Sequence, residues 1–400
     1  MDKDYTTTRR IFLGKLSAAT FGLSIQEDLV HNQLVDQLEQ KSPWEQTSDK
    51  KIKIGIVGGG FGSSFFWHQH PNCIVEAVSD LQEDRKATLM RVYKCKKSYD
   101  SLEKLVKDDK IEAVGIFTDA PSHGLHILEV LKHGKHCIVA VPLSMTLEDI
   151  EAVKEMKEKT GLTVMMAETS CFHADLFNAK LIYKKGMFGK IVYSEGEYYH
   201  FDVDTAWGWK EWRNALPPML YPTHATAYYV GVTGKRYTSV SCLGFKGNAP
   251  RYSNNPYKNP FSSETALFET SEGGMSRINI FWGTEGAEGE TGRLFGELGK
   301  FEKDTLHIGK GIGAKYEGIG DKKQLDYPDN RPALPPGMKK GGHGGSHGYL
   351  TNEFINALVE EREPVIDLYE SIALTVPGIV AHQSALRGGE RLAIPDFDKN

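Results

Sequence analysis

The sequence has little cysteine, no long hydrophobic run and no surplus of positive charge. Its five cysteines are an odd number and no two of them have C-x-x-C spacing, so neither a disulfide framework nor a cysteine metal site is indicated. The apolar runs are far shorter than the ~20 residues of a membrane-spanning helix. With 48 Lys and Arg against 53 Asp and Glu, the chain lacks the basic surface that neutralises nucleic-acid phosphates. We therefore expect buried thiols, no bound metal, no internal membrane span and no nucleic-acid partner.

The rest of the composition is that of a globular protein. Of the 400 residues, 40% are hydrophobic and 25% are charged, with 41 Gly and 17 Pro. These values exclude disorder, collagen and coiled coil. A chain of this length predicts two or three domains, at ~100–200 residues each.

The N-terminus carries a pair of arginines before a weakly hydrophobic stretch. The segment TRRIFL (residues 8–13) precedes residues 16–25, and together they resemble a twin-arginine export signal, which predicts a periplasmic protein. The alternative is a cytoplasmic extension, which Lys15 in the apolar stretch and the missing A-x-A cleavage site favour. Residues 26–50 are polar and typical of a linker.

A glycine-rich turn follows the first strand-like run of the chain. Residues 51–57 (KIKIGIV) have the length and composition of a strand and lead into GGGFGS. In a G-x-G-x-x-(G/A/S) pattern, Gly58 makes the tight turn, Gly60 lets the backbone approach a pyrophosphate, and small Ser63 permits close helix packing. We expect a helix after the turn, with its N-terminal N–H groups toward the phosphates.

A second strand supplies the other half of a dinucleotide-binding pattern. Residues 73–79 (CIVEAVS) end at Asp80, where a carboxylate can hydrogen-bond the adenosine ribose hydroxyls. Asp80 would repel a 2′-phosphate, which favours NAD, while Arg85 nearby leaves NADP as an alternative. A solvated strand-end carboxylate is the other interpretation of Asp80.

Strands and helices continue to alternate along the next part of the chain. Helical stretches (101–107, 123–133) separate strands (113–118, 136–141), which predicts βαβ units in a doubly wound parallel sheet, with the cofactor at the carboxyl ends of the strands. The loop that begins at Thr118 is expected beside the nicotinamide. The residues expected to contact the cofactor are Gly58, Gly60, Phe61, Gly62, Asp80, Arg85, Thr118, Asp119, Pro121, His123, Val141 and Pro142.

Five ordered segments of this region resemble the Gfo/Idh/MocA oxidoreductases. They are GIVGGGFG, VSDLQEDR, YDSLEKLV, IFTDAPSHGLHILEVLKHGKH and VPLSMTLED, spread over about residues 51–190. The resemblance implies an α/β protein in which a Rossmann domain precedes an α+β domain with an open, mainly antiparallel sheet. That sheet would carry a sugar site and form a homodimer or homotetramer. We divide the chain into a signal and linker (1–50), an NAD-binding domain (51–170) and a substrate-binding domain (171–400).

The chain departs from this family at the catalytic lysine. The family's Glu-Lys-Pro motif, whose lysine takes part in proton transfer from the substrate hydroxyl, is Ala140-Val141-Pro142 here. Valine neither accepts nor donates a proton. Either dehydrogenase chemistry is lost, or another group performs the acid–base work.

Tyr221 and His224 are the expected replacements for the lysine. They stand at i, i+3 spacing at the start of an apolar helix (225–232), where they can face the same side. His224 could take the hydroxyl proton, and Tyr221 could hydrogen-bond the same oxygen. Without the resemblance, a packed tyrosine and a core histidine would be the favoured interpretation.

The Tyr-x-x-His arrangement, with Val-Pro in place of Lys-Pro, also resembles the NAD-dependent glycosidases of the same superfamily. A second feature, GGHGGSH (341–347), is similar to their His-Gly-Gly segment, with Ser-His in place of Met-Asp. The resemblance implies a tightly bound cofactor that oxidises the sugar transiently at C3, so that elimination, hydration and re-reduction follow. His343 and His347 are expected to contact sugar hydroxyls; an exposed turn and a metal-binding pair are the alternatives.

Four further residues are candidates for the sugar site. Glu168 and His173 follow a strand-like run (162–166), although Glu168 could instead cap the following helix. Trp209 and Arg213 lie in an aromatic-rich stretch, and aromatic faces stack on pyranose rings. Ordinary sheet core or dimer surface is the alternative for this stretch.

These observations predict an NAD(P)-dependent carbohydrate oxidoreductase that oxidises a hydroxyl of a sugar or glycoside, at C3, by hydride transfer to the nicotinamide. A redox glycosidase that does not consume its NAD is the main alternative. A non-catalytic sugar or nucleotide sensor, supported by the loss of the lysine, is a third.

Overall fold

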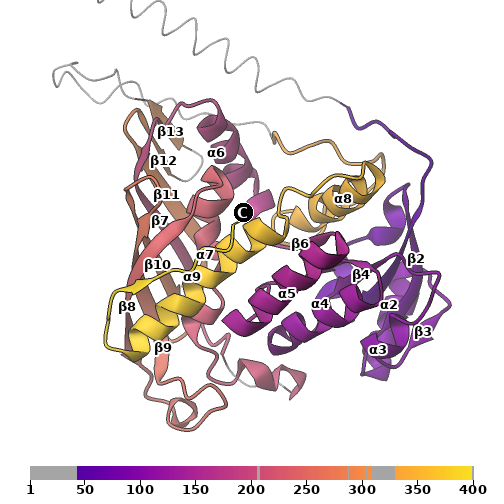
Figure 1. The fold of residues 1–400 in the computed structure, drawn as a ribbon, viewed down its shortest axis with the longest axis horizontal. Helices are drawn as coiled ribbons and strands as arrows, with labels where there is room; N and C mark the ends of the chain where they lie inside the picture. Colours follow the sequence, from indigo (N-terminus) through magenta and orange to yellow (C-terminus); the bar gives the residue numbers. More distant parts are fainter. Residues whose placement is uncertain (1–42, 205–207, 287, 303–304, 309–328, 399–400) are drawn as a thin grey trace, which may run out of the picture. The chain divides into compact units, whose positions relative to one another are not determined.

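The computed structural model describes residues 43–204, 208–286, 288–302, 305–308 and 329–398. The twin-arginine-like segment lies outside these residues. From Trp44 onward the described chain forms one unit that contains two β-sheets (Figure 1).

The first sheet has six parallel strands in the order β3-β2-β1-β4-β5-β6. The strands are β1 (Ile52–Val57), β2 (Cys73–Ser79), β3 (Ser98–Tyr99), β4 (Ala113–Ile116), β5 (His136–Val139) and β6 (Val164–Met166). The helices between them are α2 (Glu83–Tyr93), α3 (Leu102–Leu105), α4 (His123–Lys132) and α5 (Leu147–Thr160). The predicted doubly wound parallel sheet is confirmed, with the order change between β1 and β4 that creates a crevice at the strand ends.

The helix expected after the glycine turn is not an α-helix. Two short 3-10 helices, Phe61–Ser64 and Trp67–Gln69, take its place. Phe66 between them has a φ of 56°, which a continuous right-handed helix does not contain. The prediction was wrong at this point because burial of Phe65 and Trp67 in the core overrides the local helical pattern.

The second sheet has eight strands in the order β13-β12-β11-β7-β10-β9-β8-β14. The strands are β7 (Ile191–His200), β8 (Tyr237–Lys246), β9 (Phe261–Thr270), β10 (Met275–Phe281), β11 (Glu288–Gly296), β12 (Gly299–Glu302), β13 (Thr305–Ile308) and β14 (Leu392–Ala393). All pairs are antiparallel except β7 with β10. The expected open, mainly antiparallel sheet is therefore confirmed.

Helices that follow β6 in the chain pack on both sheets. They are α6 (Ala174–Lys184), α7 (Thr223–Thr226), which continues as a π-helix (Ala227–Gly231), α8 (Ser346–Val359) and α9 (Leu368–Leu386). Helix α9 contacts β8 and β6, and α8 contacts β1. Thr351 of α8 donates its hydroxyl hydrogen bond to the Phe65 carbonyl at 2.7 Å. The C-terminal helices thus hold the two sheets against each other.

Within the described residues, no helix has both the length and the apolar composition that a membrane crossing requires. The same residues contain no group of three or more His, Cys, Asp or Glu side chains arranged to hold a metal ion. All five cysteines are buried and unpaired.

Candidate functional site

The glycine turn after β1 has the geometry of a phosphate-binding loop. Gly58 has a φ of +99°, and a Cβ there would lie 2.2 Å from the Phe117 carbonyl oxygen, so only glycine fits. A Cβ on Gly62 would lie 2.7 Å from the Phe117 ring. At Gly60 the nearest atom to such a Cβ is Nη1 of Arg85, 3.8 Å away, so the backbone is open on this side. The turn is therefore packed tightly against Phe117 at Gly58 and Gly62, and its backbone is open at Gly60.

Asp80 lies at the end of β2, beside this turn. Its Oδ2 accepts a hydrogen bond from the Gly59 N–H at 2.6 Å and its Oδ1 accepts one from the Gln82 N–H at 2.8 Å. Each carboxylate oxygen keeps a lone pair for a ribose hydroxyl. The structure thus places Asp80, Gly60 and Arg85 together, as the sequence pattern predicts.

The loop after β4 and the turn after β5 form the next part of the crevice. Thr118 hydrogen-bonds His126 at 2.8 Å, Asp119 accepts from the Ser122 hydroxyl at 2.9 Å, and Pro121 lies in the short 3-10 helix (Ala120–Ser122) between them. Val141 and Pro142 are joined by a cis peptide bond, and the Val141 side chain is buried.

His123 differs from its expected role as a cofactor contact. It is only 1% exposed, and its Nδ1–H donates to the Pro142 carbonyl at 2.7 Å. Its other ring nitrogen faces the Thr118 carbonyl at 3.3 Å. Because both nitrogens point at backbone carbonyls, His123 holds the two loops together and has no atom free for a ligand.

These residues fit a bound NAD. The open face at Gly60 provides room for a pyrophosphate against the backbone, and the Asp80 carboxylate at the end of β2 is the acceptor that a ribose diol requires. A 2′-phosphate would meet the negative charge of Asp80 directly. When bound here, NAD supplies a hydride acceptor, and the fold only positions it.

A carboxylate cage surrounds His224; we use this name for Glu168, Ser170, His224 and Glu290. Nδ1 of His224 lies 2.8 Å from Oε1 of Glu168 and 3.1 Å from Oγ of Ser170, whose hydroxyl donates to Oε2 of Glu290 at 2.5 Å. Glu290 itself lies 3.8 Å from Nδ1. Within the described part of the chain, His224 forms its hydrogen bonds through Nδ1, which leaves Nε2 for a ligand.

Two glycines allow the fold to build this cage. A Cβ on Gly196 of β7 would lie 2.0 Å from the Ala225 carbonyl oxygen, so glycine lets the strand touch the start of α7. On β11, a Cβ on Gly292 would lie 2.2 Å from the Tyr228 ring. These close contacts bring β7 and β11 against the helix that carries His224, and Glu290 with them.

The two carboxylates determine the charge of His224. Burial lowers the pKa of His224, but the charges of Glu168 and Glu290 outweigh burial and raise it to about 10. Burial raises the pKa of Glu168, which is 0% exposed, but the charge and hydrogen bond of His224 outweigh it and lower the pKa to about 2. At neutral pH His224 is therefore an imidazolium. An imidazolium does not accept a proton, so this charge argues against His224 as the acceptor of the hydroxyl proton.

Glu168 also differs from its expected role in sugar binding. Its side chain is fully buried, contacts His224 and accepts from the Ser170 N–H at 2.9 Å. It therefore fixes the imidazole and the following turn, and does not face a substrate. His173 lies 3.5 Å from Glu290 at the edge of the cage, and its contact with a sugar stays a prediction.

Two tyrosine rings lie against the His224 ring. Tyr198 lies with its ring centroid 4.7 Å from that of His224, and Tyr221 lies 5.6 Å away. The Arg213 guanidinium lies 5.3 Å from the Tyr221 ring centroid. The structure thus brings Tyr221, His224 and Arg213 together, while the side chain of Trp209 lies outside the described part of the chain.

Sequence reasoning missed three members of this site: Ser170, Tyr198 and Glu290. Ser170 lies in the segment AETSCFH (167–173) and Tyr198 in the segment EGEYYHFD (195–202), but no local feature singled out either residue as a site candidate. Glu290 lies on β11, 120 positions from Ser170, and no local pattern marks it. Its signal is the pairing of β11 with β7, in which Glu290 stands opposite Tyr198.

A histidine pair lies beside the glycine turn; the name denotes His343 and His347. Nδ1 of His343 lies 2.9 Å from Nε2 of His347, and Nδ1 of His347 lies 2.9 Å from Oγ of Ser64. The Phe61 ring meets both imidazoles edge-on, with centroids 5.4 Å and 5.0 Å away. His343 is exposed and His347 is buried. Phe61 thus borders the histidines at the turn where the cofactor is expected.

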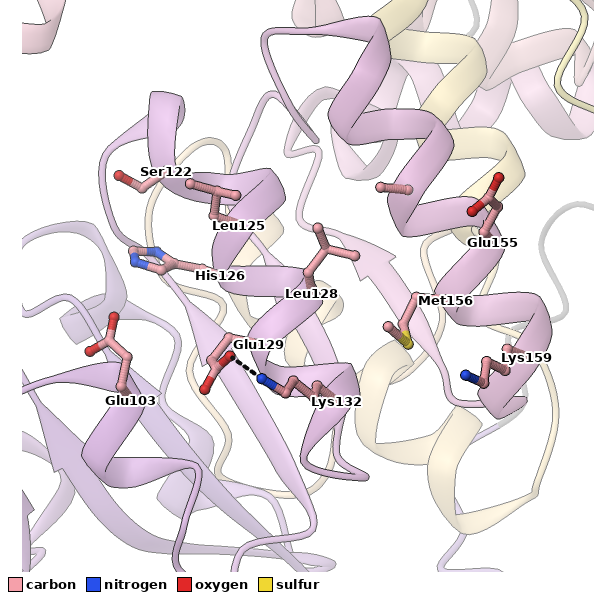
Figure 2. Close-up of a pocket in the computed structure, with 11 residues that line it drawn as sticks. Glu103, Ser122, Leu125, His126, Leu128, Glu129, Lys132, Glu155, Met156 and Lys159 are labelled. Atoms are coloured by element: carbon pink, nitrogen blue, oxygen red, sulfur yellow. Dashed lines mark ion pairs between the residues drawn. The ribbon is translucent and has the colours of Figure 1, made fainter.

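A separate hollow of about 720 Å³ lies among α3, α4 and α5 (Figure 2). Leu125, Leu128 and Met156 line it, with charged side chains such as Glu129 and Lys132 at its edge (Figure 2). None of the residues expected to hold cofactor or substrate lines it. It lies among the covering helices, so we do not assign the chemistry to it.

Comparison with known proteins agrees with this geometry. Residues 52–168 match the family described as oxidoreductase family, NAD-binding Rossmann fold, and residues 332–400 match the C-terminal domain of glycosyl hydrolase 109. The glycosyl hydrolase family 109 protein of Streptomyces filamentosus is 25% identical to this chain, and the match covers 89% of this chain and 79% of the relative. A second such protein in Akkermansia muciniphila is also 25% identical, covering 87% and 83%.

Solved structures share the fold. Levoglucosan dehydrogenase in complex with NADH and L-sorbose has a TM-score of 0.70 at 16% identity, covering 87% of this chain and 100% of that one. The scyllo-inositol dehydrogenase from Lactobacillus casei has a TM-score of 0.66 at 15% identity, covering 87% and 99%. Fold and site together define an NAD-binding oxidoreductase of the Rossmann class. The NAD-binding domain of this chain is similar to that of the Gfo/Idh/MocA oxidoreductases, and its C-terminal part is similar to the glycosyl hydrolase 109 C-terminal domain.

Proposed function

We propose that this protein oxidises a hydroxyl-bearing carbon of a sugar or glycoside, at C3, by hydride transfer to NAD. The observation that carries this proposal is the carboxylate cage, which holds a positively charged His224 with Nε2 unused, next to the strand ends of the cofactor domain. A fixed imidazolium that points at a substrate oxygen can hold that oxygen and stabilise the charge that develops on it. The relatives named glycosyl hydrolase and the sugar dehydrogenases of the same fold support a carbohydrate as substrate.

The chain's own residues would divide the work in this site. The open backbone at Gly60 and the Asp80 carboxylate would hold the cofactor. His224 would donate from Nε2 to the sugar oxygen, with Glu168 fixing its ring. Tyr221 and Arg213, which lie against each other, would bind neighbouring hydroxyls.

The test begins with protein purified without added nucleotide, from which NAD(H) is released by denaturation and identified. The native protein is then incubated with a panel of glucosides and galactosides, and products are followed by mass. A keto-glycoside two hydrogens lighter, with stoichiometric NADH, is the result expected for net oxidation. Bound NAD with no product from any sugar would contradict catalysis and favour a sensor.

A second candidate is net glycoside cleavage with an unconsumed, tightly bound NAD. It is supported by the match of residues 332–400 to the glycosyl hydrolase 109 C-terminal domain, which contains the histidine pair. In the same incubation it predicts free sugar and aglycone with no net NADH. Incubation in D₂O would then place deuterium beside the oxidised carbon, whereas simple oxidation would not.

We further propose export to the periplasm through the twin-arginine-like segment at residues 8–13. An exported protein would lack a free NAD pool, which agrees with a cofactor that is held tightly and regenerated in each cycle. Replacement of Arg9 and Arg10 by lysine should leave the full-length protein in the cytoplasmic fraction of a host with this pathway. Unchanged distribution between fractions would contradict the proposal.

A homodimer or homotetramer through the second sheet completes the proposal. The outer face of β8, β9 and β10 exposes large apolar side chains, which isolated soluble surfaces seldom gather on one sheet. They are Leu243, Phe245, Leu267 and Met275. A Phe245→Glu, Leu267→Glu double variant should sediment as a smaller species than wild type. Wild-type protein that already sediments as a monomer would exclude this assembly.

A further inference from the structure

The hydroxyl oxidation proposed above releases a proton, and two expected acceptors cannot take it. Val141 stands where the resemblance places a lysine and carries no titratable group. His224 is held as an imidazolium by the charges of Glu168 and Glu290. The site therefore needs a neutral base that a substrate can reach.

The hydrogen bonds of His347 fix which of its nitrogens carries hydrogen. Nδ1 of His347 lies 3.3 Å from the Ser64 carbonyl oxygen, which can only accept. It also lies 2.9 Å from Oγ of Ser64, whose own hydrogen is donated to the Phe61 carbonyl at 2.9 Å. Both partners are therefore acceptors, and Nδ1 of His347 carries the hydrogen.

His347 is neutral, which leaves its other nitrogen as an acceptor. The side chain is 2% exposed and stacks on Phe65 with centroids 4.4 Å apart. Burial lowers its pKa to about 4. Nε2 of His347 therefore has a free lone pair, and the hydrogen in the 2.9 Å contact belongs to Nδ1 of His343.

This chain of hydrogen bonds leaves Nε2 of His343 as a basic nitrogen. His343 is exposed, so a substrate can reach it. The charged or titratable groups that act on it are His347 behind it and His224, Glu290, His173 and Glu168 across the site. Partial desolvation of the ring, together with the charges of the facing histidines, lowers the pKa of His343 more than the carboxylates raise it. His343 is thus neutral at pH 7 while His224 is charged.

We propose that His343 is the general base of this site and accepts the proton of the sugar hydroxyl through Nε2. The proposal rests on the proposed function. In the step, the carbon's hydride leaves with two electrons for NAD⁺, the O–H electron pair becomes the second bond of the new carbonyl, and the proton binds Nε2 of His343. His347 and Ser64 are positioning residues, since they hold the tautomer and touch no substrate.

The first test reads the tautomer without any catalysis. In ¹⁵N NMR spectra of histidine-labelled full-length protein near pH 7, with assignment by single variants, both His343 and His347 should show hydrogen on Nδ1 and a bare Nε2. Ser64→Ala should weaken this preference at His347. A His343 signal with hydrogen on Nε2 would overturn the proposal.

The second test uses the reduction of bound NAD by a glycoside in a single turnover. His343 has a φ of 49°, in the left-handed region, so His343→Gly fits the backbone without strain. The variant should reduce NAD about 10²–10⁴-fold more slowly, with NAD still bound and with partial rescue by free imidazole. A control, His133→Gln at the C-terminal cap of α4, should keep the wild-type rate.

The pH profile separates a base from a structural residue. The wild-type rate should fall as pH drops through the pKa of His343, and His347→Asp, which places a carboxylate behind it, should move that fall to higher pH. If wild type reduces NAD and His343→Gly does so at the same rate, this inference alone fails. If no glycoside reduces NAD in wild type, the proposed function fails.

Discussion

The carboxylate cage and the histidine pair place the same residue type in opposite charge states. His224 lies between Glu168 and Glu290 and is held as an imidazolium. His347 lies against Phe65 and a backbone carbonyl, and burial keeps it neutral. Neighbouring groups, and not the residue type, thus give two histidines of one region opposite charge states.

The largest effect expected is on turnover when His224 is replaced. His224→Ala should lower the rate of bound-NAD reduction by about 10²–10³-fold, since removal of one donor to a developing oxyanion costs on this scale, and it should leave NAD affinity unchanged. Single-turnover kinetics and calorimetric titration of NAD measure the two quantities.

The control for this variant is a second buried histidine–glutamate pair. His382 lies 2.8 Å from Glu264, which is 0% exposed, and both are outside the cage. His382→Ala should lose stability while the folded protein keeps its rate. An unchanged rate in His224→Ala would remove the cage from the mechanism.

The next largest effect is on stability when Glu168 is neutralised. Glu168→Gln removes one of the two carboxylates that face the charged His224. Breaking a buried ion pair in this way should lower the free energy of unfolding by about 3–5 kcal/mol. Because the folded pKa of His224 is raised above the unfolded value of 6.5, this stability is fully present below pH 6.5 and is lost as pH rises toward about 10. Denaturant unfolding at several pH values measures it.

Glu264→Gln is the matched control for that experiment. In the wild type, Glu264 accepts a hydrogen bond from the Met219 N–H at 2.7 Å. The glutamine keeps an oxygen that can accept this bond but removes the negative charge beside His382. It should lower stability but leave the alkaline loss attributed to His224 in place. If Glu168→Gln keeps the same alkaline loss as wild type, Glu168 does not set the charge of His224.

A smaller effect is expected in cofactor affinity. Asp80→Ala removes the acceptor proposed for the ribose and the one that holds the Gly59 N–H. Hydrogen bonds to charged groups contribute about 1.5–3 kcal/mol, so the Kd for NAD should rise roughly ten- to a hundredfold. Titration with NAD and with sugar measures both affinities; an equal loss of sugar affinity would contradict a ribose role.

The smallest effect is expected on stability at acid pH, and it tests whether His347 is neutral in the folded protein. The folded pKa of His347 lies below the unfolded value of 6.5, so its contribution to stability is present above pH 6.5 and is lost as pH falls toward about 4. His347→Phe should flatten this acid loss, by at most about 1.4 kcal/mol per pH unit, and leave the alkaline loss unchanged. If the variant loses as much stability at acid pH as the wild type, His347 is not the group whose titration causes that loss.

The parts of the site that the sequence predicted are those built by adjacent residues. Gly58, Gly60 and Asp80 follow from two strands and a turn, where glycine conformations and a strand-end carboxylate are local requirements. The helix after the turn was predicted wrongly, because the tertiary burial of Phe65 and Trp67 decides the local backbone.

Other residues were found by pattern but given the wrong surroundings. His123 was expected beside the cofactor, yet both ring nitrogens are used by backbone carbonyls. Glu168 was expected in the sugar site, yet its carboxylate is buried on His224. A sequence pattern places a residue near a strand end but does not say which way its side chain turns.

The sequence by itself determined the dinucleotide fold, the absence of the family lysine and the candidate histidines, because each depends on residues close together in the chain. The tertiary structure alone decided the protonation of these histidines. Glu290 reaches His224 only when β11 pairs with β7, and Ser64 reaches His347 across 283 positions. A pKa depends on charge and burial within a few ångströms, and only folding brings such distant residues to that range.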